Sequence, residues 1–129
     1  MTCTARFSGW LLDSVILIDL LNGVEEAERF LQDREGVLSI SAITRAEVLA
    51  GLDSAQFEKV RGFLDRFPLH AIDAEVADEA ARLKRIHRWK LPDALQVACA
   101  LLHKHRLATR NTKDFNPRKL PWVEVPYQL

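Results

Sequence analysis

Cysteine is scarce in this 129-residue sequence, which contains only Cys3 and Cys99. Two cysteines do not make the disulfide framework that stabilises many small secreted domains. Cys99 lies in an apolar run with helical spacing, where a free thiol usually behaves as a small core side chain. We therefore expect a protein of a reducing compartment, the cytoplasm.

Long hydrophobic stretches are missing as well. No apolar run approaches the roughly 20 residues that span a bilayer, and the first residues lack the apolar core of a signal peptide. There is no internal repeat and no low-complexity tract that would mark a linker. A chain of this length can bury a core of its own, so we expect a single domain over residues 1–129, neither secreted nor inserted into a membrane.

An excess of either charge is also absent, because 18 Lys/Arg balance 18 Asp/Glu. The two signs are unevenly distributed, however. Residues 1–81 hold 7 basic and 15 acidic side chains, a net charge of −8, whereas residues 82–129 hold 11 and 3, a net charge of +8. The second part has the basic character that a phosphate backbone attracts. A folded chain can also interleave the two parts and cancel their fields, so the pattern leaves both interpretations open.

Short apolar segments alternate with amphipathic ones along the chain. The apolar segments predict buried strands at residues 10–12, 37–40, 69–72 and 107–109, and an edge strand at 122–125 between two prolines. Apolar residues at intervals of three or four predict helices after Asp13 and Ser41, and at 25–33, 57–64, 75–89 and 92–102. This alternation predicts a three-layer α/β/α sandwich with a parallel central sheet.

Four acidic side chains are candidates for a shared site at one end of this sheet: Asp13, Glu47, Asp93 and Asp114. Asp13 and Asp114 follow predicted strands, and sites of open α/β sheets form at the carboxyl ends of strands. Glu47 and Asp93 belong to predicted helices that can face the same crevice. Carboxylates that meet without His or Cys form the ligand set of a hard cation such as Mg²⁺ or Mn²⁺.

Such a site suits metal-assisted hydrolysis of a phosphodiester bond, which needs no covalent nucleophile. Nothing in the sequence indicates one, since the four histidines (His70, His87, His103 and His105) have no recognisable triad partners and there is no Gly-rich phosphate loop. Each acid also has a plainer explanation when taken alone. Asp93 is favoured in a first helical turn by the helix dipole, Glu47 can face solvent, and Asp114 can be an ordinary turn residue. Asp13 is the exception, because its neighbours on both sides are apolar.

A group of basic residues directly precedes Asp93: Arg82, Lys84, Arg85, Arg88 and Lys90. Trp89 lies among them and would offer an aromatic face on which a base can stack. We therefore expect Arg82, Arg85, Arg88 and Trp89 to bind RNA beside the metal site. The alternative is that these charges form only the solvated face of an amphipathic helix.

The acids and their local contexts together resemble the PIN-domain nucleases, and in particular the VapC toxins of bacterial toxin-antitoxin pairs. The resemblance extends over nearly the whole chain and rests on four segments: LDSVILIDLL at 12–21, residues 39–51 with Thr44 and Gly51 around Glu47, LPDALQVA at 91–98, and TRNTKDF at 109–115. The last segment is the most specific. Two features depart from the family, namely Val15 where Asn is frequent and about a dozen residues before Asp13, which leaves the true start codon open.

The resemblance implies that Asp13, Glu47, Asp93 and Asp114 are the metal-binding and catalytic residues, supported by Ser14 and Asn111. It implies a Mg²⁺- or Mn²⁺-dependent endoribonuclease, homodimeric, acting as the toxin of a type II toxin-antitoxin system and silenced by an antitoxin in the active-site groove. Asp19 is expected to be peripheral. The RNA that is cut, the number of metal ions and the cognate antitoxin are left open.

Two alternatives belong to other classes of protein. A receiver-like domain would use a strand-end aspartate to accept a phosphoryl group, but it needs an adjacent acid pair, which residues 11–14 lack. A catalytically silent PIN-like interaction module would not need all four acids.

Overall fold

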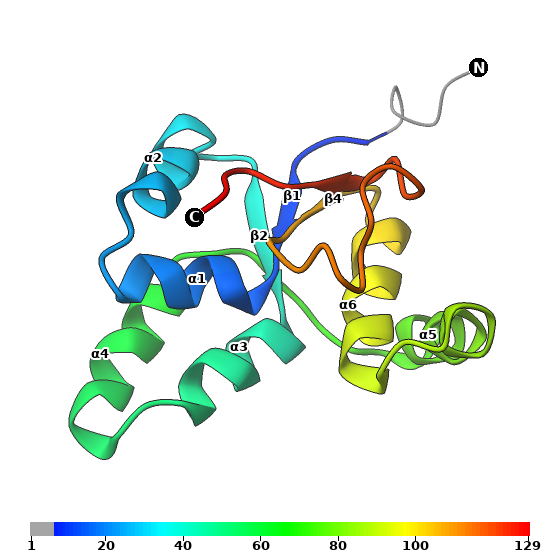
Figure 1. Ribbon diagram of the computed structural model, residues 1–129. Helices are drawn as coiled ribbons and strands as arrows, with labels where there is room; N and C mark the ends of the chain where they lie inside the picture. Colours follow the sequence, from blue (N-terminus) through cyan, green and yellow to red (C-terminus); the bar gives the residue numbers. More distant parts are fainter. Residues whose placement is uncertain (1–6) are drawn as a thin grey trace.

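A computed structural model describes residues 7–129, with five strands and six helices (Figure 1). Cys3 lies outside the described residues. The strands are β1 (Trp10–Leu12), β2 (Leu38–Ser41), β3 (Leu69–His70), β4 (Arg106–Ala108) and β5 (Val123–Glu124). The helices are α1 (Ser14–Leu21), α2 (Glu25–Asp33), α3 (Ala42–Ala50), α4 (Ser54–Leu64), α5 (Ala74–His87) and α6 (Leu91–Leu102).

The five strands form one parallel sheet in the order β3-β2-β1-β4-β5. β1 is central, and its Trp10 is in register with Leu38 of β2 on one side and with Arg106 of β4 on the other. The chain order therefore reverses at β1, which makes the gap between the carboxyl ends of β1 and β4 a topological switch point. Ligand sites of open α/β sheets form at such points.

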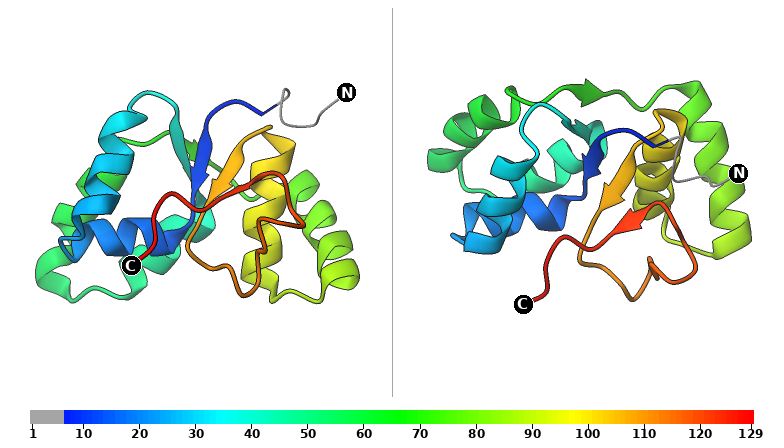
Figure 2. Two further views of the ribbon diagram at one scale, coloured as in Figure 1. Left: turned by 45° about the horizontal axis from the view of Figure 1, so that its top comes forward. Right: turned by 90° about the horizontal axis from the view of Figure 1, so that it is seen from above.

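Successive residues of a strand point to opposite faces, and this alternation creates two cores. Leu11 of β1 and Leu107 of β4 face the layer of α5 and α6, where they pack with buried residues of both helices. Leu12 and Ala108, the next residues along, face the layer of α1 to α4. Figures 1 and 2 show these helix layers on the two sides of the sheet. The expected three-layer α/β/α sandwich is confirmed.

Most helices begin where the sequence offers a side-chain oxygen to the unpaired N–H groups of the first turn. Asp13, Ser41, Asp53 and Asp73 each accept a hydrogen bond from a backbone N–H of the helix that they precede. α6 instead begins with a proline in its first turn, where the missing N–H is not needed. Because Asp13 and Ser41 also terminate β1 and β2, these two strands pass directly into helices at the site edge.

The strands differ slightly from the predicted ranges. β3 is shorter than expected because the chain leaves the sheet after His70 and reaches Asp73, the cap of α5. β5 has only two residues and lies at the edge, as its flanking prolines predict. Among residues 7–129, no helix combines the length and apolar character needed to cross a membrane.

Candidate active site

Asp13 is the buried centre of the candidate site. It lies at the carboxyl end of β1, and only 9% of its surface is exposed. Its backbone N–H continues the sheet by donating to the Ala108 carbonyl oxygen over 2.9 Å. Its side chain turns back to accept a hydrogen bond at Oδ1 from the Ser14 N–H, also at 2.9 Å. The carboxylate is thus held at the switch point by the strand-to-helix turn itself.

Two further side chains donate to Asp13. The Thr109 hydroxyl donates to Oδ2 at 2.6 Å, and the Gln96 Nε2 amide donates to Oδ1 at 3.3 Å. Both partners are buried, with Gln96 2% exposed and Thr109 fully covered. Neither residue was expected to have a role in the site. The signal that was available is a lone amide, Gln96, on the otherwise apolar buried face of α6.

Glu47 lies on α3 next to the beginning of α1. The residue is solvent-exposed, and partial desolvation of its carboxyl group nevertheless raises its pKa. The negative charge of Asp13 raises this pKa further, while a hydrogen bond from the Ser14 side chain lowers it. Ser14 and Asp13 therefore both act on the Glu47 carboxyl group, which places it beside the strand-end acid.

Asp93 lies in the first turn of α6 and is half-buried. Burial raises its pKa to about 6, with further contributions from the charges of Asp13, Asp114 and Glu47 and a small opposing one from Lys90. A carboxyl group responds in this way when other carboxylates share its surroundings. Side chains from four separate segments therefore act on one another within a common acidic region.

Asp114 is exposed in the loop that follows β4, and Asn111 and Trp89 hold that loop in place. The Asn111 side chain makes two contacts with it: Nδ2 donates to the Asp114 Oδ2 atom at 3.0 Å, and Oδ1 accepts from the Asp114 N–H at 3.3 Å. The Trp89 indole Nε1–H donates to the Asp114 carbonyl oxygen at 3.0 Å. The next residue, Phe115, is fully buried against Trp89, with their rings 5.3 Å apart. The loop is thereby anchored on both sides of Asp114.

Oxygen ligands of this kind fit a hard divalent cation. As their side chains stand, residues 7–129 contain no group of three or more His, Cys, Asp or Glu residues that could hold a metal ion. The four acids are unequally restrained. Asp13 is fixed by its three donors, whereas Glu47 and Asp114 are exposed and Asp93 is half-buried, so these three can change rotamer. The acidic region has the oxygen ligands of a metal site. Its side chains, as they stand, are not gathered closely enough around one point to enclose a cation.

The basic residues beside the site differ in what they contact. Arg82 pairs with Glu79 one helical turn away, so its charge is partly neutralised. Arg85 and Arg88 are exposed at the end of α5. The expectation for Trp89 is wrong, because this side chain is only 7% exposed and packs against Phe115 and Trp122 beneath His87. It cannot offer a free face to a base.

Asp19 is held in a separate network of polar contacts. It is 6% exposed and forms a bidentate ion pair with Arg110, whose Nε and Nη2 donate to its carboxylate at 2.6 Å and 2.8 Å. The Tyr127 hydroxyl donates to the same carboxylate at 2.7 Å. Asp19 therefore ties α1 to the loop after β4 and to the C-terminal segment.

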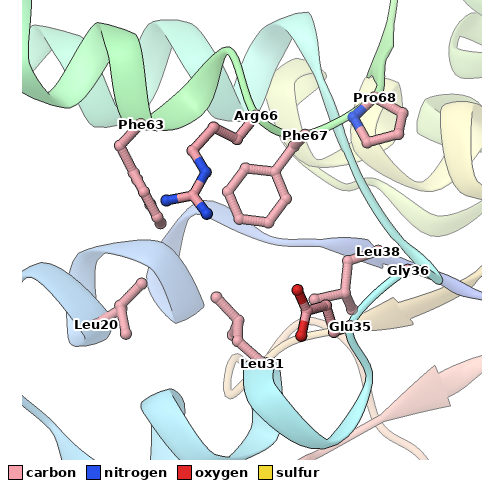
Figure 3. A pocket seen from close by; sticks show the side chains of 9 residues that line it. All are labelled: Leu20, Leu31, Glu35, Gly36, Leu38, Phe63, Arg66, Phe67 and Pro68. Carbon is pink, nitrogen blue, oxygen red and sulfur yellow. The ribbon is translucent and has the colours of Figure 1, made fainter.

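An apolar groove lies away from the four acids, between α1, α2, β2 and the end of α4. Figure 3 shows Phe63 and Phe67 pointing toward Leu20 and Leu31, with Leu38 beside them. Arg66 and Glu35 add charges to its lining. None of the four acids lines this groove, so the apolar groove and the acidic site are separate features.

The comparisons with known proteins agree with this arrangement. The family model of the PIN domain matches residues 10–117. Ribonuclease VapC10 of Mycobacterium tuberculosis is 33% identical over 112 residues, covering 81% of this chain and 84% of the relative. A toxin-antitoxin complex from Klebsiella pneumoniae contains a chain that is 38% identical with a TM-score of 0.88, covering 94% of this chain and all of that one.

FitAcB from Neisseria gonorrhoeae shares the fold at 24% identity with a TM-score of 0.75, covering 93% of this chain and 99% of that chain. The match of the family model covers both the sheet and the segments that carry the four acids. The chain therefore belongs to the PIN-domain family and is a homologue of the VapC ribonucleases.

Proposed function

We propose that this protein is a metal-dependent endoribonuclease that hydrolyses RNA phosphodiester bonds. The proposed metal ligands and catalytic residues are Asp13, Glu47, Asp93 and Asp114. The observation that carries the proposal is that acids from separate segments lie together near the carboxyl end of β1, where Asp13 precedes α1 and the charges of Asp13, Asp114 and Glu47 all act on Asp93 in the first turn of α6. Four acids that would repel one another in a small region are stable there when a cation neutralises them.

A bound Mg²⁺ or Mn²⁺ supplies Lewis-acid chemistry, because it favours hydroxide over water and neutralises charge that develops on the phosphate. Asp13 is held in place by three hydrogen-bond donors and would be the fixed ligand. Asp93, whose pKa is raised to about 6, would hold the cation in its ionised form. Glu47 and Asp114 lie at the exposed rim, where their side chains can move toward the cation.

Arg85 and Arg88 are the proposed contacts for the RNA backbone. Both are exposed, and they precede the segment that carries Asp93 by a few residues. Lys90 adds positive charge next to that acid. A basic rim beside an acidic metal site would hold the polyanion without neutralising the carboxylates.

We further propose that the protein acts as the toxin of a type II pair in the cytoplasm, as a homodimer, and that a cognate antitoxin is its partner. The toxin-antitoxin complex from Klebsiella pneumoniae supports the partner, since its matching chain is 38% identical to this one. We place part of the antitoxin contact in the apolar groove, which lies apart from the acidic site that the resemblance expects the antitoxin to cover. Phe63→Asp should then weaken co-purification with the protein encoded next to this one, and light scattering tests the dimer.

Incubation of the purified protein with total RNA tests the proposed activity. Cleavage is expected with Mg²⁺ or Mn²⁺ and should stop with EDTA. The variants Asp13→Asn and Asp93→Asn should both lose cleavage. Asp78→Asn, which removes an exposed carboxylate from α5, is the matched control and should remain active. Equal activity of Asp13→Asn and wild type would overturn the proposal.

Two other functions predict different results. A silent interaction module would show no metal-dependent cleavage at all. A phosphoryl acceptor needs a second acid directly beside its aspartate, whereas the neighbours of Asp13 are Leu12 and Ser14. The surroundings of Asp13 therefore favour the nuclease over the phosphoacceptor.

A further inference from the structure

We propose that Gln96 is a positioning residue that determines which oxygen of Asp13 is free to bind the cation. The proposal rests on the proposed metal site and extends it to a side chain that does not contact the reacting atoms. Gln96 is 2% exposed and lies among the buried apolar residues of α6. A buried amide is unfavourable unless its donors and acceptor are satisfied, so its partners indicate its role.

The hydrogen bonds of Gln96 permit only one orientation of its amide. The Thr44 hydroxyl donates to the Leu12 carbonyl oxygen at 2.9 Å, so its oxygen is left to accept from Gln96 Nε2. The Ser41 hydroxyl donates to Gln96 Oε1. A flipped amide would place Oε1 against the Asp13 carboxylate and lose both donated bonds. The Nε2 group therefore faces Asp13.

Gln96 Nε2 and two other donors together occupy three of the four acceptor positions of Asp13. Oδ1 accepts from the Ser14 N–H and from Gln96 Nε2, while Oδ2 accepts from the Thr109 hydroxyl. A carboxylate has about two lone-pair positions on each oxygen. The remaining position is therefore on Oδ2, and Asp13 is set to bind a cation through that single oxygen.

Gln96 also connects the elements that carry the other acids. It follows Asp93 by three residues on α6, so the two side chains lie on neighbouring positions of the same helix face. Thr44, its second partner, precedes Glu47 by three residues on α3. One buried amide thus links β1, α3 and α6 at the site, and it fixes the buried ligand relative to the movable ones.

The variant Gln96→Met tests this role, because methionine fills a similar volume without an amide. Titration calorimetry with Mn²⁺ is expected to show a dissociation constant raised by about 10-fold or more, the usual effect of removing a group that orients a metal ligand. In saturating Mn²⁺ the kcat for RNA cleavage should also fall, with KM for RNA nearly unchanged.

Three controls separate this role from a loss of packing. Val97→Ala opens a cavity on the same helix without removing a hydrogen-bonding group and should lower the melting temperature while leaving Mn²⁺ affinity unchanged. Ser41→Ala removes one partner of Gln96 and the side-chain cap of α3 but keeps the donor to Asp13, so a lower melting temperature with a smaller effect on Mn²⁺ affinity is expected. If Gln96→Met does not fold, Gln96→Asn keeps an amide that is too short to reach Asp13, and the same rise is expected.

The outcomes distinguish the two proposals. Wild-type Mn²⁺ affinity in Gln96→Met, together with weakened binding in Asp13→Asn, would overturn the role of Gln96 alone. Unchanged Mn²⁺ binding in Asp13→Asn would overturn the metal site itself and the role of Gln96 with it. Weakened binding in both variants, with Val97→Ala like wild type, would support both.

Discussion

The indole N–H of Trp89 donates a hydrogen bond to the main-chain carbonyl oxygen of Asp114 across 3.0 Å. The two residues are 25 positions apart, and the contact joins the end of α5 to the loop that carries the fourth acid. Trp89 is buried in the core, whereas Asp114 is exposed. An exposed loop residue thus takes its position from a buried aromatic side chain.

Replacing Trp89 with Phe should loosen this loop while keeping an aromatic ring in the core. The lost hydrogen bond is expected to lower the free energy of unfolding by about 1 kcal/mol. The loss is this small because water can bind the Asp114 carbonyl oxygen once the indole is gone. RNA cleavage should fall by more than this stability loss explains. Urea unfolding and cleavage rates at saturating Mn²⁺ would measure the two effects. Cleavage at the wild-type rate would show that Trp89 contributes packing only.

Removing the charge of Asp19 should destabilise the fold without affecting metal binding. Asp19→Asn breaks charge-assisted hydrogen bonds to Arg110 and Tyr127, at a cost of roughly 2–3 kcal/mol. Tyr127→Phe removes only one of them and should cost about 1 kcal/mol. Chemical denaturation measures both values. A larger effect for Tyr127→Phe than for Asp19→Asn would contradict the assignment of Asp19 as the centre of this network.

The same network predicts a dependence of stability on pH. Burial opposes ionisation of Asp19, but hydrogen bonds from Arg110 and Tyr127 outweigh it and lower its pKa. A carboxyl group whose pKa is lower in the folded state contributes stability above its ordinary pKa of about 3.9. That contribution is lost as the pH falls through the folded-state value. Asp19→Asn should therefore flatten the stability curve below pH 4 relative to wild type.

Much of the fold was predictable because strand and helix periodicities are local properties of the sequence. The end-of-strand position of Asp13 follows from that periodicity together with the rules for parallel sheets, whereas the strand order that makes β1 the switch point was not predicted. Exposure is not local. Trp89 stands among basic residues in the sequence, yet Phe115 and Trp122 close over it from segments more than 25 residues away. Its surroundings in the sequence therefore indicated the wrong role.

The support of the site was also only partly predictable. Asn111 and Asp114 are three residues apart, and their contact belongs to one turn. By contrast, Gln96 and Asp13 are separated by 83 residues, and Asp19 and Arg110 by 91. Such contacts depend on how the helices pack on the sheet. The polar character of Gln96 within an apolar helix was the one sign available in advance, and its partner could not be deduced from it.

His70 is a second residue, besides Asp19, that makes the stability of the fold depend on pH. Its ring stacks on His103 at 3.7 Å, and its Nε2 lies 3.1 Å from Nε2 of His105. Burial, followed by the charges of His103 and His105, lowers the pKa of His70. The unfolded chain therefore takes up a proton before the folded protein does as the pH drops below about 6.5.

The folded state should consequently lose stability as the pH falls from 7.5 toward 5.5. His70→Gln removes the titrating ring and should reduce this loss. Melting temperatures of both proteins across that range provide the measurement, and His87→Gln serves as a control with a histidine outside the cluster. Identical pH profiles for wild type and His70→Gln would contradict the prediction.

Charge reversal at Arg85 and Arg88 should weaken RNA binding. Both side chains are exposed, so substitution should leave the fold intact. Each phosphate contact with single-stranded RNA contributes about −0.7 to the slope of log affinity against log salt concentration. The double variant Arg85→Glu/Arg88→Glu is therefore expected to flatten the slope by about 1.4 if both residues contact phosphates. Arg29→Glu on α2 is the matched control. RNA binding is measured by fluorescence anisotropy at several salt concentrations, in an Asp93→Asn background that does not cleave the RNA. Unchanged affinity at low salt would show that these arginines do not belong to the RNA-binding surface.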